Sequence, residues 1–208
     1  MKVLVAGAHG QVGQHVVALL SRSEHEVRAL VRDQTQVSKL EKLGAEAVVA
    51  DLKGDVSHAV KGCDAIIFAA GSGGKDVEGV DRDGAIKLMR VAQTKGVRRY
   101  VMLSSMGADT PERGPDELRD YLKAKKEADV KLRASELTYT IIRPGQLTNE
   151  AATGHIRAAK HFDEPGKITR EDVAKTLVMA LEHPNTHGKT FEILNGDDPI
   201  GEALASLA

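Results

Sequence analysis

The sequence has one cysteine, Cys63, among its 208 residues, and it carries little net charge. A single cysteine excludes an intramolecular disulfide and a metal site built from several cysteines, and its position before an apolar run indicates a small buried residue. A net charge of −1 lacks the basic excess that is typical of proteins that bind nucleic acid or anionic membranes.

Long apolar segments are also missing. No run reaches the roughly 20 residues that span a bilayer, and the N-terminal "MKVLVAGAHG" lacks the apolar core and cleavage site of a signal peptide. We therefore expect a soluble, cytoplasmic protein whose partner is a small-molecule substrate rather than nucleic acid or a membrane. The sequence contains no signal for the oligomeric state.

The composition is that of an ordinary globular protein, with 41% hydrophobic and 28% charged residues. The length suits one α/β domain, and no repeat, low-complexity tract or linker divides the chain. We therefore expect a single domain over residues 1–208.

Short apolar runs alternate along the chain with segments of helical periodicity. The expected strands occupy residues 2–7, 26–32, 45–51, 64–71, 98–105, 138–145 and 189–196. The expected helices occupy residues 13–22, 36–44, 56–62, 84–96, 115–135 and 168–183. The last of these opens with a capping pattern of Thr169 and Asp172. Apolar strands separated by helices predict an α/β fold, with a doubly wound parallel sheet covered by helices on both faces.

Two stretches fit neither pattern, residues 107–118 and residues 149–167. Both follow predicted strands, and ligands of doubly wound sheets bind beyond the carboxyl ends of the strands. We therefore expect both to border the active site, with residues 146–170 as a substrate-side loop region.

The stretch "VLVAGAHGQVGQHVVALL", residues 3–20, places three glycines between an apolar run and a segment of helical spacing. Gly7 would end the strand at a sharp turn, Gly10 would let the backbone approach a pyrophosphate, and Gly13 would let the helix pack closely on the strand. The first N–H groups of such a helix bind phosphate. A glycine-rich turn without a ligand is the alternative, but the strand-loop-helix context favours dinucleotide binding. The predicted phosphate site takes in Gly7, His9, Gly10, Gln11, Val12 and Gly13.

The end of the second strand distinguishes two cofactors. An acidic residue there accepts hydrogen bonds from the adenosine ribose and favours NAD, whereas an arginine binds a 2′-phosphate and favours NADP. In "ALVRDQ", Arg32 comes first and Asp33 follows. Arg32 therefore predicts NADP (NADPH). The alternatives are a solvated charge at Arg32 and a ribose acceptor at Asp33, which would favour NAD.

Two further segments are candidate contacts for the nucleoside. Asp51 at the end of "AEAVVAD" is placed to accept a hydrogen bond from the adenine amino group, or else to cap the next helix. The small residues Ala69, Ala70 and Gly71 would let the backbone pass close to a ribose. Residues 72–74 fit a flexible loop equally well.

The candidate catalytic group combines Tyr121 and Lys125 of "YLKAK" with a serine of "LSS". Spacing of i and i+4 places the first two on one helix face, where an ammonium would stabilise a phenolate and hold the nicotinamide ribose. Ser104 or Ser105 would orient a substrate carbonyl. The helix carries other lysines, so coincidence is the alternative interpretation, but the position between "LSS" and "TIIRPG" favours catalysis.

No metal site is expected. His183 and His187 are four residues apart, but Pro184 lies between them and no third ligand is evident.

In total, the chain resembles an atypical short-chain dehydrogenase/reductase, and is most similar to epimerase/dehydratase-like or NmrA-like NAD(P)-binding proteins. The resemblance runs through "AGAHGQVG", "VRD", "DAIIFAAGSGG", "GVRRYVMLSS", "YLKAKKEAD", "LTYTIIRPGQLTNE", "ITREDVAKTLVMAL" and "FEILNGDDPI". It implies a Rossmann-type sheet with the dinucleotide across the strand ends, a small C-terminal substrate-side region, and NADP(H) as the cofactor.

The resemblance also implies a role for each matching residue. Those roles are phosphate binding by Gly7, Gly10 and Gly13, 2′-phosphate binding by Arg32, adenine contact by Asp51 and Leu52, ribose contact by Ala69 to Gly71, and nicotinamide-side contact by Lys125 and Pro144, with Ser104 also facing the cofactor.

The sequence thus predicts an NADP-dependent oxidoreductase that acts on a small carbonyl, quinone or flavin-like substrate. The main alternative is a non-catalytic NADP(H)-binding redox sensor or regulatory protein, as several NmrA-like proteins are. A nucleotide-sugar epimerase or dehydratase is a third possibility, against which the short segment after Gly145 argues.

Overall fold

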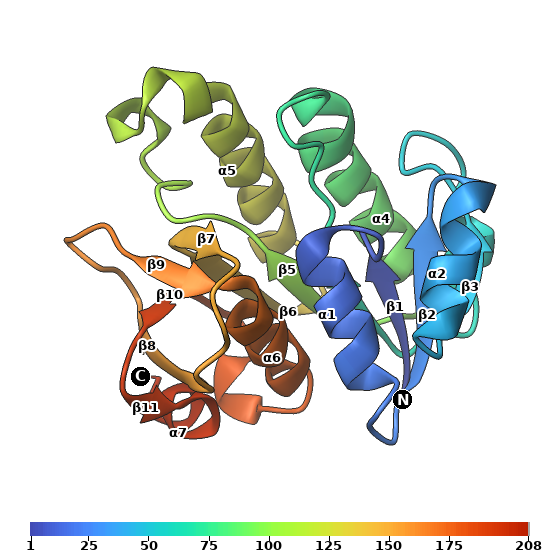
Figure 1. Ribbon diagram of the computed structural model, residues 1–208. Coiled ribbons are helices and arrows are strands. Elements are labelled where there is room, and N and C mark those ends of the chain that lie inside the picture. The colour runs from blue at the N-terminus through green and yellow to red at the C-terminus, as the bar shows by residue number, and fades with distance from the viewer. Residues whose placement is uncertain (208) are drawn as a thin grey trace.

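The computed structural model describes residues 1–207 and contains all seven expected strands in one sheet (Figure 1). The seven run parallel in the order β3-β2-β1-β4-β5-β6-β10. Their bounds are β1 (Lys2–Ala6), β2 (Glu26–Val31), β3 (Glu46–Val49), β4 (Ala65–Phe68), β5 (Arg99–Leu103), β6 (Thr138–Pro144) and β10 (Lys189–Asn195). The chain starts in the middle of the sheet and winds outward in both directions, which confirms the Rossmann-type fold class.

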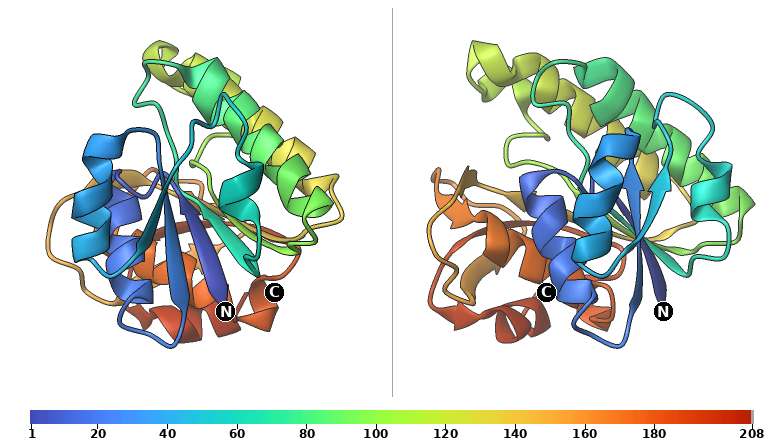
Figure 2. Two further views of the ribbon diagram at one scale, coloured as in Figure 1. Left: turned by 90° about the vertical axis from the view of Figure 1, so that its right-hand side faces the viewer. Right: turned by 45° about the vertical axis from the view of Figure 1, so that its right-hand side comes forward.

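Helices cover both faces of the sheet (Figure 2). The α-helices are α1 (Gln11–Leu20), α2 (Val37–Lys42), α3 (Ser57–Val60), α4 (Ala85–Thr94), α5 (Arg119–Arg133), α6 (Arg170–Ala180) and α7 (Ile200–Ala205). Short 3-10 turns are η1 (Gln34–Gln36), η3 (Pro111–Arg113), η4 (Asp116–Leu118) and η5 (Pro184–Thr186), and η2 (Val77–Gly84) is π-helical. The sequence predicted α4 but not the π-helical segment that precedes it.

The two faces of the sheet bury separate apolar cores. Val3 and Val5 of β1 point into the core with α1, α2, α6 and α7, whereas Leu4 and Ala6 point into the core with α3, α4 and α5. Because both sides of each central strand are covered, the strands need apolar residues at consecutive positions. This is the physical reason that the strands were readable from the sequence.

The stretch 146–170, expected as a loop region, contains three strands: β7 (Gln146–Thr148), β8 (His155–Ala159) and β9 (Lys167–Thr169). β7 pairs with β9 in a small parallel ribbon. β8 joins the main sheet antiparallel to β10, and β11 (Asp198–Pro199) pairs with β8. Only Ile156 of β8 is fully buried, so the segment lacks the apolar run that marks the central strands.

Thr169 caps α6 as its sequence predicts, since its Oγ1 accepts a 3.0 Å hydrogen bond from the Asp172 N–H. Cys63 is buried. Within residues 1–207, no helix is both long enough and apolar enough to cross a membrane.

Candidate functional site

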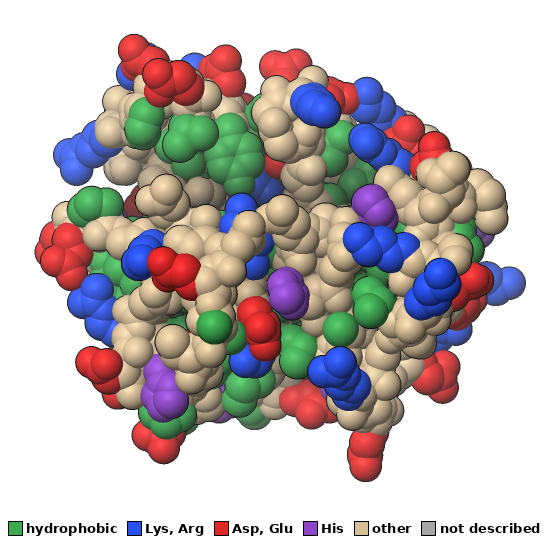
Figure 3. All heavy atoms as spheres, in the orientation of Figure 1, with side chains coloured by type: hydrophobic (Ala, Val, Ile, Leu, Met, Phe, Trp, Pro, Cys, Tyr) green, Lys and Arg blue, Asp and Glu red, His purple; other side chains and the backbone are tan. Residues whose placement is uncertain are grey.

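The carboxyl ends of the central strands border a cleft of about 1290 Å³. A second cleft of about 400 Å³ adjoins it beside the ends of β2 and β3. The two share the lining residues Gly10, Ala69, Ala70, Gly71 and Asp76, so they form one continuous groove. The space-filling view shows this face hollowed between α5 and the segment around β7 (Figure 3).

The glycine loop lies at the junction of the two clefts. Gly7 has φ +81°, and a Cβ there would collide with the backbone of Ala69 and Ala70. A Cβ on Gly13 would collide with the carbonyl of Gly7, because α1 packs directly on the loop. Gly10 is the N-cap residue of α1 and supplies no side-chain cap, and the first turn contains no acidic residue. The first N–H groups of α1 are therefore available to an anion from the cleft.

The smaller cleft is lined by three basic side chains, those of Arg32, Lys53 and Lys75. Two carboxylates, Asp51 and Asp76, line it as well, together with Gly7, His9 and Leu52. Lys53 is ion-paired with Asp76. Arg32 makes no ion pair with any residue in the described range 1–207, and it is exposed at the end of β2.

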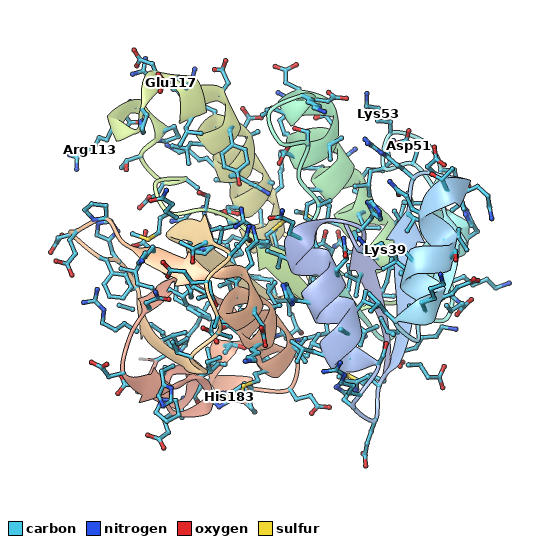
Figure 4. All side chains as sticks on the ribbon, in the orientation of Figure 1. Lys39, Asp51, Lys53, Arg113, Glu117 and His183 are labelled. Carbon is cyan, nitrogen blue, oxygen red and sulfur yellow. The ribbon has the colours of Figure 1, made fainter. Side chains whose placement is uncertain are left out.

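The two carboxylates near Arg32, Asp33 and Asp51, accept hydrogen bonds from residues two positions further along the chain. Asp33 accepts hydrogen bonds from the N–H and Oγ1 of Thr35, at 2.8 and 2.7 Å, and these bonds lower the pKa of the Asp33 carboxyl. Asp33 does not line the cleft, whereas Asp51 does. Asp51 also accepts a 2.9 Å hydrogen bond from the Lys53 N–H. Figure 4 places Asp51 and Lys53 together after β3, far from Glu117 of η4, the turn before α5.

The larger cleft contains the predicted tyrosine–lysine pair. Lys125 Nζ lies 5.6 Å from the centre of the Tyr121 ring and 5.9 Å from that of Phe68. It donates a 3.2 Å hydrogen bond to the Leu103 carbonyl, and the side chain is 3% exposed. Tyr121 is half-buried and lines the cleft.

The two serines at the end of β5 differ in their surroundings. Ser104 is buried, and its Oγ donates a 2.9 Å hydrogen bond to Asp129 Oδ2. Ser105 is half-buried, and its Oγ lies 3.2 Å from the Met106 carbonyl. Both line the larger cleft, with Pro144 from the end of β6.

Three charged residues of this region escaped the sequence interpretation. Asp129 of α5 accepts hydrogen bonds from Arg143 of β6 as well as from Ser104. Burial raises the pKa of the Asp129 carboxyl, and the Arg143 guanidinium opposes that shift. Asp81 of η2 is 1% exposed and lies 3.7 Å from Lys125 Nζ. In the sequence, each resembles an ordinary solvated charge.

The tertiary structure thus brings most of the predicted site residues to one groove. Those lining it are Gly7, His9, Gly10, Gln11, Val12, Arg32, Asp51, Leu52, Ala69, Ala70, Gly71, Ser104, Ser105, Tyr121, Lys125 and Pro144. Gly13 instead packs beneath the loop, where its lack of a side chain lets α1 approach.

Comparison with known proteins agrees with this geometry. A family model described as "NAD(P)H-binding" matches residues 7–184. An uncharacterized sugar epimerase of Bacillus subtilis is 47% identical, over 100% of both chains. A solved structure named as an NAD-dependent epimerase/dehydratase from Bacillus halodurans is 44% identical, covers 100% of both chains, and superimposes with a TM-score of 0.96. The oxidoreductase ylbE from Lactococcus lactis is 36% identical, with a TM-score of 0.91, over 99% of this chain and 96% of its own.

The glycine loop, the groove across the strand ends and the family match over residues 7–184 lead to one conclusion. This chain belongs to the NAD(P)H-binding family.

Proposed function

We propose that the protein is an NADP(H)-dependent oxidoreductase that reduces a small carbonyl, quinone or flavin-like acceptor. The observation that carries the proposal is the continuous groove, which joins the uncapped start of α1 and the end that contains Arg32 to Tyr121, Lys125 and Ser105. The oxidoreductase name of the Lactococcus lactis relative supports it, whereas the two Bacillus relatives have epimerase names.

The residues present fit a dinucleotide. The start of α1 offers N–H donors to a pyrophosphate, because Gly10 supplies no side-chain cap and the first turn contains no acidic residue. Gly7 and Gly13 let the loop and α1 pack closely enough to present them. The small residues Ala69, Ala70 and Gly71 line both clefts, so the ribose-bearing middle of the ligand would cross there.

The preference for NADP rests on the smaller cleft. A 2′-phosphate is a dianion, and Arg32 has no carboxylate partner in the described chain while Lys75 and His9 line the same cleft. Asp33, which would favour NAD as a ribose acceptor, is bonded to Thr35 instead. We infer that Arg32 binds the 2′-phosphate bidentately, as the planar guanidinium allows.

The chain's own residues supply the acid–base chemistry. Bound NADPH would supply a hydride to the acceptor. Tyr121 would donate a proton to the acceptor oxygen, and the Lys125 ammonium beside its ring would stabilise the phenolate that remains. Ser105 would orient the acceptor, because it is the more exposed of the two serines, whereas Ser104 is buried and bonded to the buried carboxylate of Asp129.

The first experiment is calorimetric titration of the wild type and Arg32→Ala with NADP⁺ and NAD⁺. We expect a wild-type preference for NADP⁺ and a loss of about tenfold or more in NADP⁺ affinity for Arg32→Ala, with NAD⁺ affinity changed less than twofold. A wild-type preference for NAD⁺ would overturn the cofactor assignment.

The second experiment measures NADPH oxidation with a panel of quinones, flavins and small aldehydes, for the wild type and Tyr121→Phe. We expect turnover of at least one acceptor by the wild type, and a loss of about 100-fold or more in kcat for Tyr121→Phe. Unchanged turnover in Tyr121→Phe contradicts the tyrosine mechanism. Tight NADPH binding without turnover of any acceptor favours a redox sensor, and binding of a uridine-diphosphate sugar favours an epimerase.

A further inference from the structure

Asp81 is a buried carboxylate, and one of its two oxygens accepts no hydrogen bond from the described residues. Its Oδ2 accepts hydrogen bonds from the N–H and Oγ of Ser72, at 3.0 and 2.7 Å. Its Oδ1 has no hydrogen-bond partner among residues 1–207, although the side chain is only 1% exposed. Buried carboxylate oxygens are rarely left unpartnered, because their desolvation costs free energy that hydrogen bonds must offset.

The unpartnered oxygen faces Lys125, whose Nζ lies 3.7 Å away. Asp129 is the other fully buried carboxylate near this lysine, one helical turn along α5. Arg143 already neutralises Asp129 through two hydrogen bonds of 3.0 and 2.9 Å. Two buried cations thus face two buried carboxylates, and Asp81 is the one that remains as the counterion of Lys125.

The same carboxylate also reaches the backbone that separates the two clefts. Ser72 lines the smaller cleft, and its neighbour Gly71 lines both. A Cβ on Gly71 would lie 3.3 Å from Asp81 Oδ1, so the glycine passes directly over the carboxylate. Asp81 is therefore in contact with Lys125 at the floor of one cleft and with the segment that continues into the other.

The position of Asp81 depends on the π-helical turn η2. Asp76 starts this turn by accepting a 3.1 Å hydrogen bond from the Gly79 N–H, and Asp76 is itself paired with Lys53. π-Helical turns are uncommon and occur often at functional sites. Here the turn brings Asp81 between α5 and the segment after β4.

We propose that Asp81 is a positioning residue for the hydride-transfer site, which holds Lys125 in place and couples it to Gly71 and Ser72. The inference rests on the proposed function, since Lys125 and Gly71 are the groups that would contact the cofactor. Loss of the Asp81 charge would therefore shift Lys125 and the Gly71–Ser72 backbone together.

The test compares Asp81→Asn, which keeps the shape and removes the charge, with Asp83→Asn as a matched control. Asp83 is an exposed carboxylate of the same π-helical turn, paired with Arg82. The first measurement is the lysine ammonium NMR spectrum of protein labelled with ¹⁵N-lysine, in which the Lys125 signal is the one absent from Lys125→Arg. We expect that signal to shift or broaden beyond detection in Asp81→Asn and to stay in place in Asp83→Asn.

The second measurement is NADP⁺ affinity by calorimetry. Removing a negative charge near the groove would by itself favour an anionic ligand, so a loss of affinity reports lost positioning. We expect about a tenfold loss for Asp81→Asn, as for removal of one charge-assisted contact, and less than a twofold change for Asp83→Asn. An unchanged Lys125 signal, or unchanged or tighter NADP⁺ binding, in Asp81→Asn would overturn the proposal.

A second variant covers the case in which Asp81→Asn does not fold. Ser72→Ala keeps the Asp81 charge and the backbone N–H bond but removes the 2.7 Å hydroxyl bond. We expect about a threefold loss of NADP⁺ affinity with a shifted Lys125 signal, and no change in either would contradict the coupling. If the wild type does not bind NADP⁺, the proposed function fails, while the Lys125 signal still tests the ion pair independently.

Discussion

Arg143 donates hydrogen bonds from Nε and Nη2, at 3.0 and 2.9 Å, to one oxygen of Asp129 in the interior between β6 and α5. The same oxygen accepts the Ser104 hydroxyl, so the pair ties the ends of β5 and β6 to the helix that carries Tyr121 and Lys125. Through its Nη1, Arg143 also lies 3.6 Å from Asp109 on the segment that follows β5. The geometry of the groove around Tyr121 and Lys125 therefore depends on this pair.

Removal of one partner of this pair should destabilise the fold strongly. Asp129→Leu leaves the Arg143 guanidinium buried without its carboxylate, and we expect the free energy of unfolding in urea to fall by about 3–5 kcal/mol. The double variant Asp129→Leu/Arg143→Met should recover at least about 1 kcal/mol of that loss, because no uncompensated charge remains. A double variant less stable than Asp129→Leu would contradict the ion-pair interpretation.

Substitution of Ser104 should affect mainly stability, whereas substitution of Ser105 should affect mainly activity. Ser104→Ala removes a buried hydrogen bond to Asp129 and should lower the free energy of unfolding by about 1–3 kcal/mol. Ser105→Ala should leave stability within about 0.5 kcal/mol and lower kcat/KM for NADPH-dependent reduction by about 10- to 100-fold. Urea unfolding and initial-rate kinetics on the same preparations measure both, and the opposite pattern would identify Ser104 as the substrate-facing serine.

Gly13 should be intolerant of even the smallest side chain. A Cβ there meets the Gly7 carbonyl at a distance that requires α1 to move away from the loop. We expect Gly13→Ala to lower the free energy of unfolding by about 2 kcal/mol or more and to abolish NADP⁺ binding in calorimetry. Gly54→Ala is the control, since its nearest contact would be an ordinary 3.5 Å from the Asp51 carbonyl. Equal effects at the two glycines would count against the close-packing role of Gly13.

Glu46 should contribute to stability only above acidic pH. Its hydrogen bond with Lys2, and then that with Arg28, lower the pKa of the Glu46 carboxyl in the folded state. The contribution is complete above the unfolded-state pKa of about 4.3 and is lost as the pH falls through the lower folded-state value. Because the side chain is half exposed, we expect Glu46→Gln to cost only about 0.5 kcal/mol at pH 7.

The measurement is urea unfolding of wild type and Glu46→Gln at pH 7 and pH 3. The difference between the two proteins should shrink at pH 3, where the wild-type carboxyl is also losing its charge. Glu26→Gln, at an exposed position on β2, serves as the control without an ion pair among residues 1–207. A difference that grows towards acidic pH would contradict the sign of the shift.

Much of the fold was predictable because its signals are local. The apolar run from Val3 to Ala6 needs no knowledge of its neighbours to be recognised as a strand buried on both faces. The Thr169 cap lies three residues from its partner Asp172. β8 was missed because only Ile156 of it is fully buried, so this segment lacks the run of consecutive apolar residues that marks the central strands.

The same distinction applies to the site. By itself, the sequence determined the strand-loop-helix glycine motif, the arginine after β2 and the i, i+4 spacing of Tyr121 and Lys125, because each of these is a pattern of near neighbours. Only the tertiary structure decided that Ser104 faces Asp129 and that Asp81 faces Lys125, because these pairs join residues of different elements that lie far apart in the sequence. The sequence alone does not show whether a charged residue is exposed or buried. Asp81 and Lys125 come into contact only because the fold packs η2 against α5.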